Sequence, residues 1–412
     1  MRVILVPLGS HGDVHPFLGL GKALSARGHD VLVVANPWFA EMIAAQGLVH
    51  EPFGTIADYE AATSDPDLWH PRRAARVVGR FAGPMIEPLY RVLASRHTPD
   101  TVVVAPGLAF GARLAQERLG VRLVTVHLQP VVFWSDHVTP AMAGLCLPAR
   151  SPRFVKHGLR WLMDRELNIA FGRPLGAARR DLGLRPLDVP LLTWWNSPHR
   201  VLALFPEVFG PPQPDWPAQV RLTNFPLFDE SDTFEPTDSM SGWLSDGGPP
   251  LVFTPGSANR HAHRFFATAV ATCRRLGCRG VLLTRFGDQV PSALPRDVRH
   301  FDYLPLSFVL PYAAGLVHHG GIGTLSQAAV AGIPQLIVPQ AHDQFDNAAR
   351  VTRLGVGTCL TPGRFRSRRA ATALRTLTGS DEVASACRRV AGAVRATPGL
   401  QAACQIVEEV ER

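Results

Sequence analysis

Val317 to Asn347 reads VHHGGIGTLSQAAVAGIPQLIVPQAHDQFDN. A short apolar segment, Tyr312 to Val317, leads into a glycine-rich turn, and a helical pattern follows from Leu325 to Ala331. A glycine and a proline then break the chain before a second apolar run, Gln335 to Val338. This order predicts a strand, a glycine turn, a helix and a second strand. The turn and the helix N-terminus would then lie at the carboxyl end of a sheet, where ligands bind.

The residue types in this turn indicate which ligand would bind. Glycines let backbone N–H groups approach an anion, and the helix dipole favours negative charge at the same point. A histidine beside the turn, His318 or His319, can donate a hydrogen bond to a phosphate oxygen. Past the second strand, Asp343 and Gln344 suit sugar hydroxyls. The stretch therefore predicts a nucleotide-sugar site, with an ordinary turn carrying incidental histidines as the alternative.

The order of these residues resembles the donor-site signature of family 1 glycosyltransferases, the inverting nucleotide-sugar enzymes of the two-domain GT-B fold. The resemblance assigns the donor sugar to Asp343 and Gln344. This chain departs from the family pattern at Gln327, where many members carry a glutamate for the ribose hydroxyls. The resemblance assigns the donor nucleotide and diphosphate to His319, Gly320, Gly321, Gly323, Thr324 and Gln327.

Length and composition are those of a globular protein with more than one domain. The chain has 412 residues, of which 46% are hydrophobic and 18% charged, and single cores rarely grow beyond about 250–300 residues. Its apolar runs are shorter than the roughly 18–20 residues of a membrane span, and the first ten residues do not resemble a signal peptide. The six cysteines show no metal spacing and are expected to be buried thiols. We therefore expect a cytoplasmic protein.

The net charge is +8 and comes mostly from arginine. No known nucleic-acid motif and no interleaving of aromatic and basic residues accompanies it, so no nucleic-acid partner is expected. A solvated basic surface is the simplest interpretation. A weak peripheral association with the inner face of the membrane is the alternative.

The first half of the chain alternates strand and helix patterns. Val3 to Leu8 predicts a buried parallel strand, and Gly9 to Asp13 a turn. Pro16 is expected to open the following helix. Further strands are expected at Asp30 to Ala35, Thr101 to Ala105 and Arg122 to Val126, with a helix from Ala109 to Leu119 between the last two. This alternation predicts a doubly wound α/β domain.

Asp13 is the only carboxylate in the first turn, and its position before a helical pattern has two interpretations. It can cap the helix, or it can act as a general base in the crevice at the strand ends. In the family members whose turn reads GSxGD, among them vancomycin-type antibiotic and sterol glycosyltransferases, the base is aspartate. This chain reads GSHGD, so the resemblance implies Asp13 as the base. It also places Ser10 and His11 beside the acceptor, with the neighbouring His15 as the alternative to His11 in lining the acceptor pocket.

Residues 52–100 and 127–215 depart from regular alternation and are rich in proline, tryptophan and arginine. Within them, Arg150 to Leu184 predicts basic amphipathic helices. The aromatic residues either pack a domain insertion or wall an apolar acceptor pocket. We expect His127, Phe133 and Trp134, which follow a strand end, to form that wall.

A second domain begins after an acidic, hydroxyl-rich segment. The expected boundaries are 1–227 for an acceptor-binding Rossmann-like domain, 228–241 for the linker, 242–390 for a nucleotide-sugar-binding Rossmann-like domain, and 391–412 for a helix that returns to the first domain. The two domains would face a central cleft. The resemblance places Ser257 at the donor phosphates. It also places the ring of Tyr303 and the backbone amide of Leu304 at the nucleobase, whereas a tyrosine in a strand is otherwise a core residue.

Segments outside the donor loop resemble the rhamnosyltransferases of rhamnolipid synthesis. They include DPDLWHP (65–71), NFPLFD (224–229) and PLVFTPGS (250–257). The resemblance implies an inverting transfer of rhamnose from dTDP-rhamnose to a hydroxyl of a lipophilic acceptor, a hydroxy-fatty acyl chain or a polyketide. The alternatives are a UDP-glucose-dependent natural-product or sterol glucosyltransferase, a nucleotide-sugar 2-epimerase, and a catalytically silent partner protein. We expect no metal and no cofactor beyond the nucleotide-sugar co-substrate.

Overall fold

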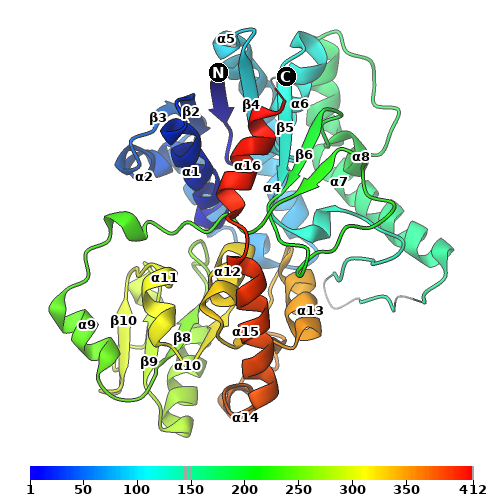
Figure 1. The fold of residues 1–412 in the computed structure, drawn as a ribbon. Helices are drawn as coiled ribbons and strands as arrows, with labels where there is room; N and C mark the ends of the chain where they lie inside the picture. The colour runs from blue at the N-terminus through cyan, green and yellow to red at the C-terminus, as the bar shows by residue number, and fades with distance from the viewer. Residues whose placement is uncertain (143–145, 149, 411–412) are drawn as a thin grey trace.

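The computed structural model of this chain describes residues 1–142, 146–148 and 150–410. Two parallel sheets form the framework, and they lie one above the other in Figure 1. The first sheet has the strand order β3-β2-β1-β4-β5-β6-β7. Its strands are β1 (Arg2–Leu5), β2 (Asp30–Ala35), β3 (Val49–Pro52), β4 (Thr101–Pro106), β5 (Arg122–His127), β6 (Arg200–Ala203) and β7 (Val220–Leu222).

Helices cover both faces of this first sheet because its central strands are apolar on both sides. Val3 and Leu5 of β1 pack into one core, and Ile4 packs into another on the opposite face. Neighbouring strands pair in parallel, for example Val3 with Val102 of β4. The helices are α1 (His11–Ala26), α2 (Ala40–Ala45), α3 (Ile56–Ser64), α4 (Ala74–Ala82), α5 (Ile86–Arg96), α6 (Phe110–Leu119), α7 (Arg153–Asp181) and α8 (Leu191–Trp194).

The second sheet repeats the architecture with the order β10-β9-β8-β11-β12-β13. Its strands are β8 (Leu251–Thr254), β9 (Gly280–Leu283), β10 (Val298–Phe301), β11 (Gly315–His318), β12 (Gln335–Ile337) and β13 (Gly357–Cys359). Its helices are α9 (Asp238–Ser245), α10 (His263–Leu276), α11 (Leu306–Val309), α12 (Ile322–Ala331), α13 (Gln344–Leu354), α14 (Ser367–Thr378), α15 (Asp381–Arg395) and α16 (Gly399–Glu408). The expected pair of Rossmann-like domains is confirmed.

The last helix lies against the first domain (Figure 1). The chain leaves α15 through Pro398, and α16 then packs on α1, where Arg27 donates to both carboxylate oxygens of Glu408 at 2.6 and 2.7 Å. The Asn224 side chain donates to the carbonyl of Val394 at 2.7 Å. These contacts tie α16 to the first domain, and the end of α15 to the start of the connecting segment between β7 and β8.

Several sequence-based expectations about element boundaries were wrong. The first helix begins at His11, before Pro16, because the Asp13 carboxylate accepts from the backbone N–H of Ser10 and starts the helix there. Tyr303 follows β10 and is not part of a strand. The region expected to hold several basic helices is one helix, α7, of 29 residues.

Candidate active site

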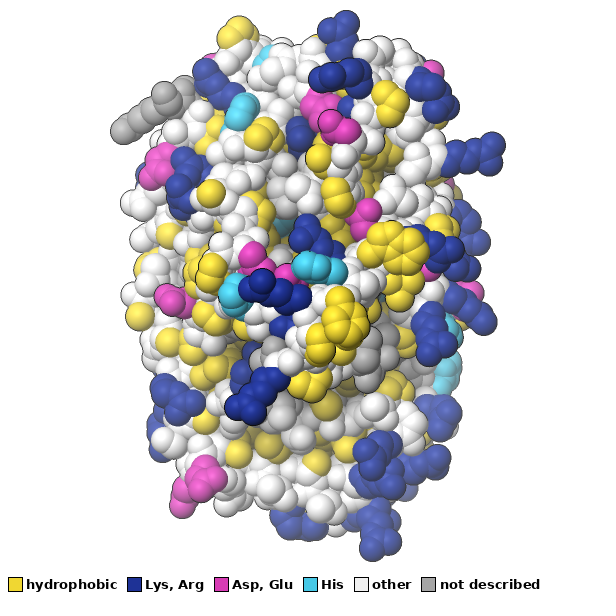
Figure 2. All heavy atoms as spheres, turned by 90° about the vertical axis from the view of Figure 1, so that its right-hand side faces the viewer, with side chains coloured by type: hydrophobic (Ala, Val, Ile, Leu, Met, Phe, Trp, Pro, Cys, Tyr) yellow, Lys and Arg dark blue, Asp and Glu magenta, His cyan; other side chains and the backbone are white. Residues whose placement is uncertain are grey.

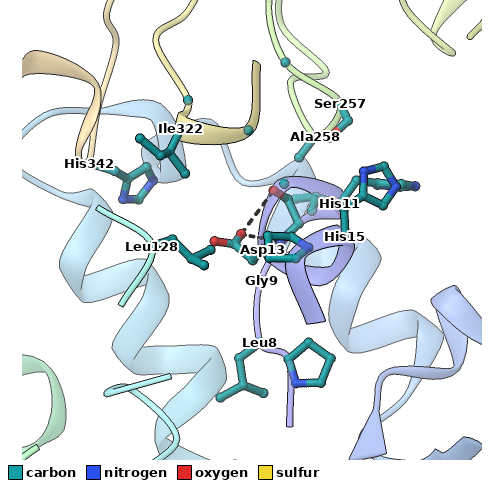
Figure 3. A pocket seen from close by; sticks show the side chains of 18 of the residues that line it. Leu8, Gly9, His11, Asp13, His15, Leu128, Ser257, Ala258, Ile322 and His342 are labelled. Carbon is teal, nitrogen blue, oxygen red and sulfur yellow. Dashed lines mark hydrogen bonds between the residues drawn. The ribbon is translucent and has the colours of Figure 1, made fainter. Parts of the chain in front are cut away.

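A cavity of about 590 Å³ lies between the two domains. Loops at the carboxyl ends of both sheets line it, and Figure 3 shows Asp13 and His11 of the first domain facing Ser257, Ala258 and Ile322 of the second. The cavity brings together most of the residues singled out in the sequence. These are Ser10, His11, Asp13, Ser257, Tyr303, Leu304, His319, Gly321, Gly323, Thr324, Gln327, Asp343 and Gln344.

The Asp13 carboxylate is held by its own loop. Its Oδ2 accepts from the backbone N–H of Ser10 at 2.8 Å and from the Ser10 hydroxyl at 3.2 Å. Its Oδ1 has no hydrogen-bond partner among the described residues and belongs to a side chain that lines the cavity. Gly9 makes this geometry possible, because it has a φ of +127° and an added Cβ would lie 2.2 Å from Oδ2. Asp13 is therefore both helix cap and cavity carboxylate.

Burial raises the pKa of Asp13 above its usual range, although the two hydrogen bonds from Ser10 oppose the shift. A carboxylate with a raised pKa is a better proton acceptor, provided that it is still ionised at the working pH. The position and the electrostatics of Asp13 therefore suit a general base.

His11 is held differently from its neighbour. Its Nε2 lies 3.0 Å from a guanidinium nitrogen of Arg285, which can only donate, so Nε2 accepts. Burial, reinforced by the positive charge of Arg285, lowers the pKa of His11 to about 3. His11 is therefore neutral at pH 7 and its basic nitrogen is already engaged. Sequence reasoning missed Arg285, which reaches the first domain from the loop after β9.

The His319 ring occupies a slot between two glycines of the second domain. A Cβ on Gly256 would lie 2.8 Å from the ring, and a Cβ on Gly321 would lie 2.4 Å from Nε2. Neither ring nitrogen has a hydrogen-bond partner among the described residues, and the side chain lines the cavity. Burial, with a smaller contribution from His342, lowers the pKa of His319 to about 4. His319 can therefore donate one N–H to an anion as a neutral imidazole.

The neighbouring histidine supports the turn and does not reach the cavity. The Nδ1 of the buried His318 accepts from the backbone N–H of Gly320 at 3.1 Å. Its Nε2 therefore carries the proton and donates to the side-chain oxygen of Gln335, Oε1, at 3.0 Å. Gly320 itself does not line the cavity; its φ is +97° and an added Cβ would lie 2.8 Å from Ile337. Gly320 was expected to contact the donor, but it only shapes the turn.

The turn after β12 presents Asp343 and Gln344. The Asn347 amide donates to Asp343 Oδ2 at 2.6 Å and to the Gly320 carbonyl at 2.8 Å, which ties this turn to the His319 loop. The Gln344 amide oxygen accepts from the backbone N–H groups of Gln340 and Ala341, at 2.7 and 3.1 Å. The oxygen of Gln344 is therefore engaged, and the side chain offers its NH₂ group to a ligand.

Asp343 and Asp13 interact electrostatically across the cavity. Burial, and secondly the negative charge of Asp13, raise the pKa of Asp343 to about 7. Two carboxylates in one site titrate as a coupled pair, so the ionisation of each depends on the other.

The part of the cavity where the sequence predicts the nucleotide contains Tyr303, Leu304 and Gln327. The Tyr303 hydroxyl donates to the Asp229 carbonyl at 2.7 Å, and the Arg285 guanidinium lies 5.1 Å from the centre of its ring. One ring face is thus covered by Arg285. The Leu304 backbone N–H and the Gln327 amide have no hydrogen-bond partner among the described residues, so both are available to a ligand.

The other end of the cavity is apolar, and most of its wall comes from the first of the two irregular regions, not from His127, Phe133 and Trp134. The wall residues lie within 53–111, on α3 to α6 and the turns between them, and include Phe53, Tyr59, Trp69, Val78, Phe81, Met85, Ile86, Leu89 and Phe110. From the region that was expected to form the wall, the strand-end residues Leu128 and Gln129 line the cavity.

His127, Phe133 and Trp134 lie away from this cavity. The His127 ring is buried and contacts the Phe133 ring edge-on. Its Nε2 lies 2.8 Å from the side-chain oxygen of Asn196, Oδ1. The Phe133 ring stacks on the Trp216 ring, with 4.7 Å between the ring centres. His127 and Phe133 are thus packed in the interior, so the packing alternative is the correct one for these two, while Trp134 is partly buried and does not line the cavity.

Two further histidines line the cavity: His15, which the sequence had offered as a neighbour of His11 in the acceptor pocket, and His342, which sequence reasoning missed. His15 lies 2.9 Å from Glu230 of the connecting segment and so links the catalytic loop to that segment. His342 lines the cavity next to Asp343 and has a φ of +56°, a left-handed conformation that is uncommon outside glycine. A histidine between an alanine and the Asp-Gln pair was the available signal for this second residue.

The comparisons with known proteins are consistent with this geometry. Residues 282–410 match the family described as erythromycin biosynthesis protein CIII-like, C-terminal domain. The chain is 30% identical to the O-mycaminosyltylonolide 6-deoxyallosyltransferase of Streptomyces fradiae over 437 aligned positions, which cover 99% of this chain and 97% of that protein.

Two solved structures have the same fold along the whole chain. The glycosyltransferase of kitacinnamycin superposes with a TM-score of 0.76 at 22% identity, covering 100% of this chain and 99% of that one. A spinosyn rhamnosyltransferase complexed with thymidine diphosphate superposes with a TM-score of 0.69 at 21% identity, covering 99% and 100%.

Proposed function

Because this chain belongs to the family 1 glycosyltransferases of the GT-B fold and the erythromycin CIII-like type, related to vancomycin-type and sterol enzymes, we propose that it transfers a hexose or deoxyhexose, with inversion, to a hydroxyl of a lipophilic acceptor. At the coarser level it is a nucleotide-sugar glycosyltransferase of the natural-product type. One observation carries the finer proposal: a single cavity holds the Asp13 carboxylate, an anion-binding turn opposite it, and an apolar end.

The chemistry follows from the placement of these groups. Oδ1 of Asp13 takes the proton of the acceptor hydroxyl, whose oxygen attacks the anomeric carbon of the donor sugar. The bond from that carbon to the diphosphate breaks on the opposite side, so the configuration inverts. Negative charge then develops on the departing diphosphate. The His319 N–H, the backbone amides of Gly321 to Thr324 and the N-terminus of α12 stabilise it.

Incubation with donor alone, and then with a mixture of lipophilic acceptors, tests this function against its alternatives. A glycosyltransferase releases nucleoside diphosphate together with a glycosylated product only when acceptor is present. A nucleotide-sugar 2-epimerase converts the donor without acceptor, and a silent partner protein does neither. Donor conversion without acceptor, or no reaction with any acceptor, contradicts the proposal.

Acceptor binding should depend on chain length because the acceptor end of the cavity is apolar. Each CH₂ removed from a hydroxy-fatty acyl acceptor is expected to weaken binding by about 0.8 kcal/mol, or roughly fourfold, measured as acceptor KM or Kd across a homologous series. Phe81→Ala should weaken binding of the longest acceptor by about tenfold. Trp134→Ala, a residue outside the cavity, is the control. Equal effects of the two variants, or no dependence on chain length, would count against this assignment.

The donor preference is expected to depend on Gln327. Its neutral amide accepts hydrogen bonds from a ribose more weakly than a glutamate does, and a dTDP donor has no 2′-hydroxyl to be recognised. We therefore favour dTDP-rhamnose over UDP-glucose. The test is a competition of dTDP-rhamnose, dTDP-glucose and UDP-glucose for one accepted acceptor.

Gln327→Glu should raise kcat/KM for UDP-glucose by about 10- to 100-fold, the value of one charge-assisted hydrogen bond of about 1.5–3 kcal/mol. Its effect on the dTDP donors is the internal control. If UDP-glucose wins the competition and the variant changes nothing, Gln327 does not set the nucleotide preference.

A further inference from the structure

The outer side of α7 carries large apolar side chains that are exposed. Phe154 is 76% exposed and Trp161 65%, values typical of fully solvated residues. Leu162 and Ile169 are also exposed, and the spacing i, i+7, i+8 and i+15 places all four along one side of the helix. We refer to them as the α7 stripe. Exposed apolar groups gathered in this way mark an interaction surface more often than chance placement.

Arginines flank the α7 stripe, and two acidic side chains of the helix interact with other parts of the protein. Asp164 accepts from the backbone N–H of Leu192 at 3.1 Å, and Glu166 pairs with Arg76 at 3.7 Å. Figure 2 shows the face that carries α7, where hydrophobic and basic side chains lie next to one another. Three exposed arginines have no ion-pair partner among the described residues: Arg153, Arg165 and Arg173.

The inner side of α7 lies one helix away from the apolar end of the cavity. α4 packs against it so closely that a Cβ on Gly79 would lie 2.6 Å from the Ala170 carbonyl. Val78 of α4 packs with the same core as Phe171 of α7 and also lines the cavity. A surface docked on the stripe would therefore lie beside the acceptor end of the site.

We propose that α7 docks this protein on an anionic lipid bilayer, with the α7 stripe inserted at the level of the headgroups and the flanking arginines against lipid phosphates. An exposed aromatic and aliphatic stripe bordered by unpaired arginines is the chemistry of an interfacial helix. Among the described residues, no helix is both long and apolar enough to cross the membrane, so the contact is peripheral. The proposal extends the proposed function, because a lipophilic acceptor partitions into the surface from which α7 would present the cavity.

The test is flotation of the whole protein with vesicles of phosphatidylcholine alone and with vesicles containing phosphatidylglycerol, without donor or acceptor. Wild-type protein should float with the anionic vesicles only, and added salt should weaken the binding. The double variant Phe154→Ser/Trp161→Ser should bind at least about tenfold more weakly. Arg153→Gln and Arg165→Gln should each weaken binding to the anionic vesicles by about fivefold. Trp161 fluorescence, isolated as the difference between wild type and Trp161→Ser, should shift to the blue on binding.

Val49→Ser, which removes another exposed apolar side chain at the far edge of the first sheet, is the matched control and should bind like wild type. Absence of binding to anionic vesicles, or equal binding by the double variant, overturns the proposal. A dimer in solution that the double variant abolishes, with no vesicle binding, would instead assign the stripe to a second copy of the chain. Because no substrate is present, failure here leaves the proposed transfer reaction intact, and failure of the transfer reaction leaves this result intact.

Discussion

Asp13→Asn is expected to lower turnover by about 10²- to 10⁴-fold, the usual contribution of a general base. The amide keeps the size and the helix-capping position of the carboxylate but cannot take a proton from the acceptor. The variant should still bind the nucleotide-sugar donor, because the residues proposed to bind it lie in the second domain. Turnover is measured with saturating donor and acceptor, and donor binding by calorimetry with the nucleoside diphosphate.

His11→Ala is the matched comparison for this variant. His11 is neutral and its Nε2 already accepts from Arg285, so its removal should lower turnover much less than the Asp13 change. If both variants collapse equally, the base is His11 or a pair of residues. If Asp13→Asn turns over at nearly the wild-type rate, Asp13 is only a helix cap.

The glycine-rich turn between β11 and α12 could be predicted from the sequence because its parts are consecutive. A strand, a glycine turn and a helix start are local patterns, and their order places His319 and the backbone amides at one point without knowledge of the rest of the chain. The same holds for Asp13, which lies in the first turn of the helix that follows the first strand. The start of the first helix was misjudged, because the hydrogen bond from Ser10 to Asp13 outweighs the signal of Pro16.

The acceptor wall could not be predicted in this way. An apolar residue that lines a cavity and one that packs a core have the same periodicity, so Phe81 and Phe133 look alike in the sequence. What distinguishes them is the packing of whole helices. A Cβ on Gly111 would lie 2.4 Å from the Ile86 carbonyl, so α6 can approach α5 closely, and residues of both helices, with those of α4, line the cavity. Such contacts join segments far apart in the chain.

Arg285 was missed for a related reason. Its hydrogen bond with His11 joins the two domains and exists only when they face each other, while its contact with the ring of Tyr303 lies within the second domain. No local pattern marks an arginine that follows a strand as a site residue. Residues that act across the domain interface therefore need the structure to be found.

Asp343→Asn is expected to lower kcat/KM for the donor by about 10- to 100-fold, because each hydrogen bond from a sugar hydroxyl to a carboxylate is worth about 1.5–3 kcal/mol. Asn347 holds the carboxylate in place, so the substitution removes charge while leaving the turn intact. The measurement is donor kcat/KM at saturating acceptor. Asn347→Ala, which removes the hydrogen bonds that hold this turn and lies outside the cavity, tests whether any disturbance of the turn has the same effect.

The pH dependence of donor binding gives the sharper test of the same residue. The pKa of Asp343 is raised to about 7, first by burial and then by the charge of Asp13, so the acceptor form of the carboxylate is lost as pH falls through about 7. Donor KM should therefore rise on acidification in the wild type and stay level across that range in Asp343→Asn. Asp13→Asn removes one cause of the shift, so the inflection should move to lower pH. An inflection near pH 7 that persists unchanged in both variants would show that Asp343 does not control donor binding.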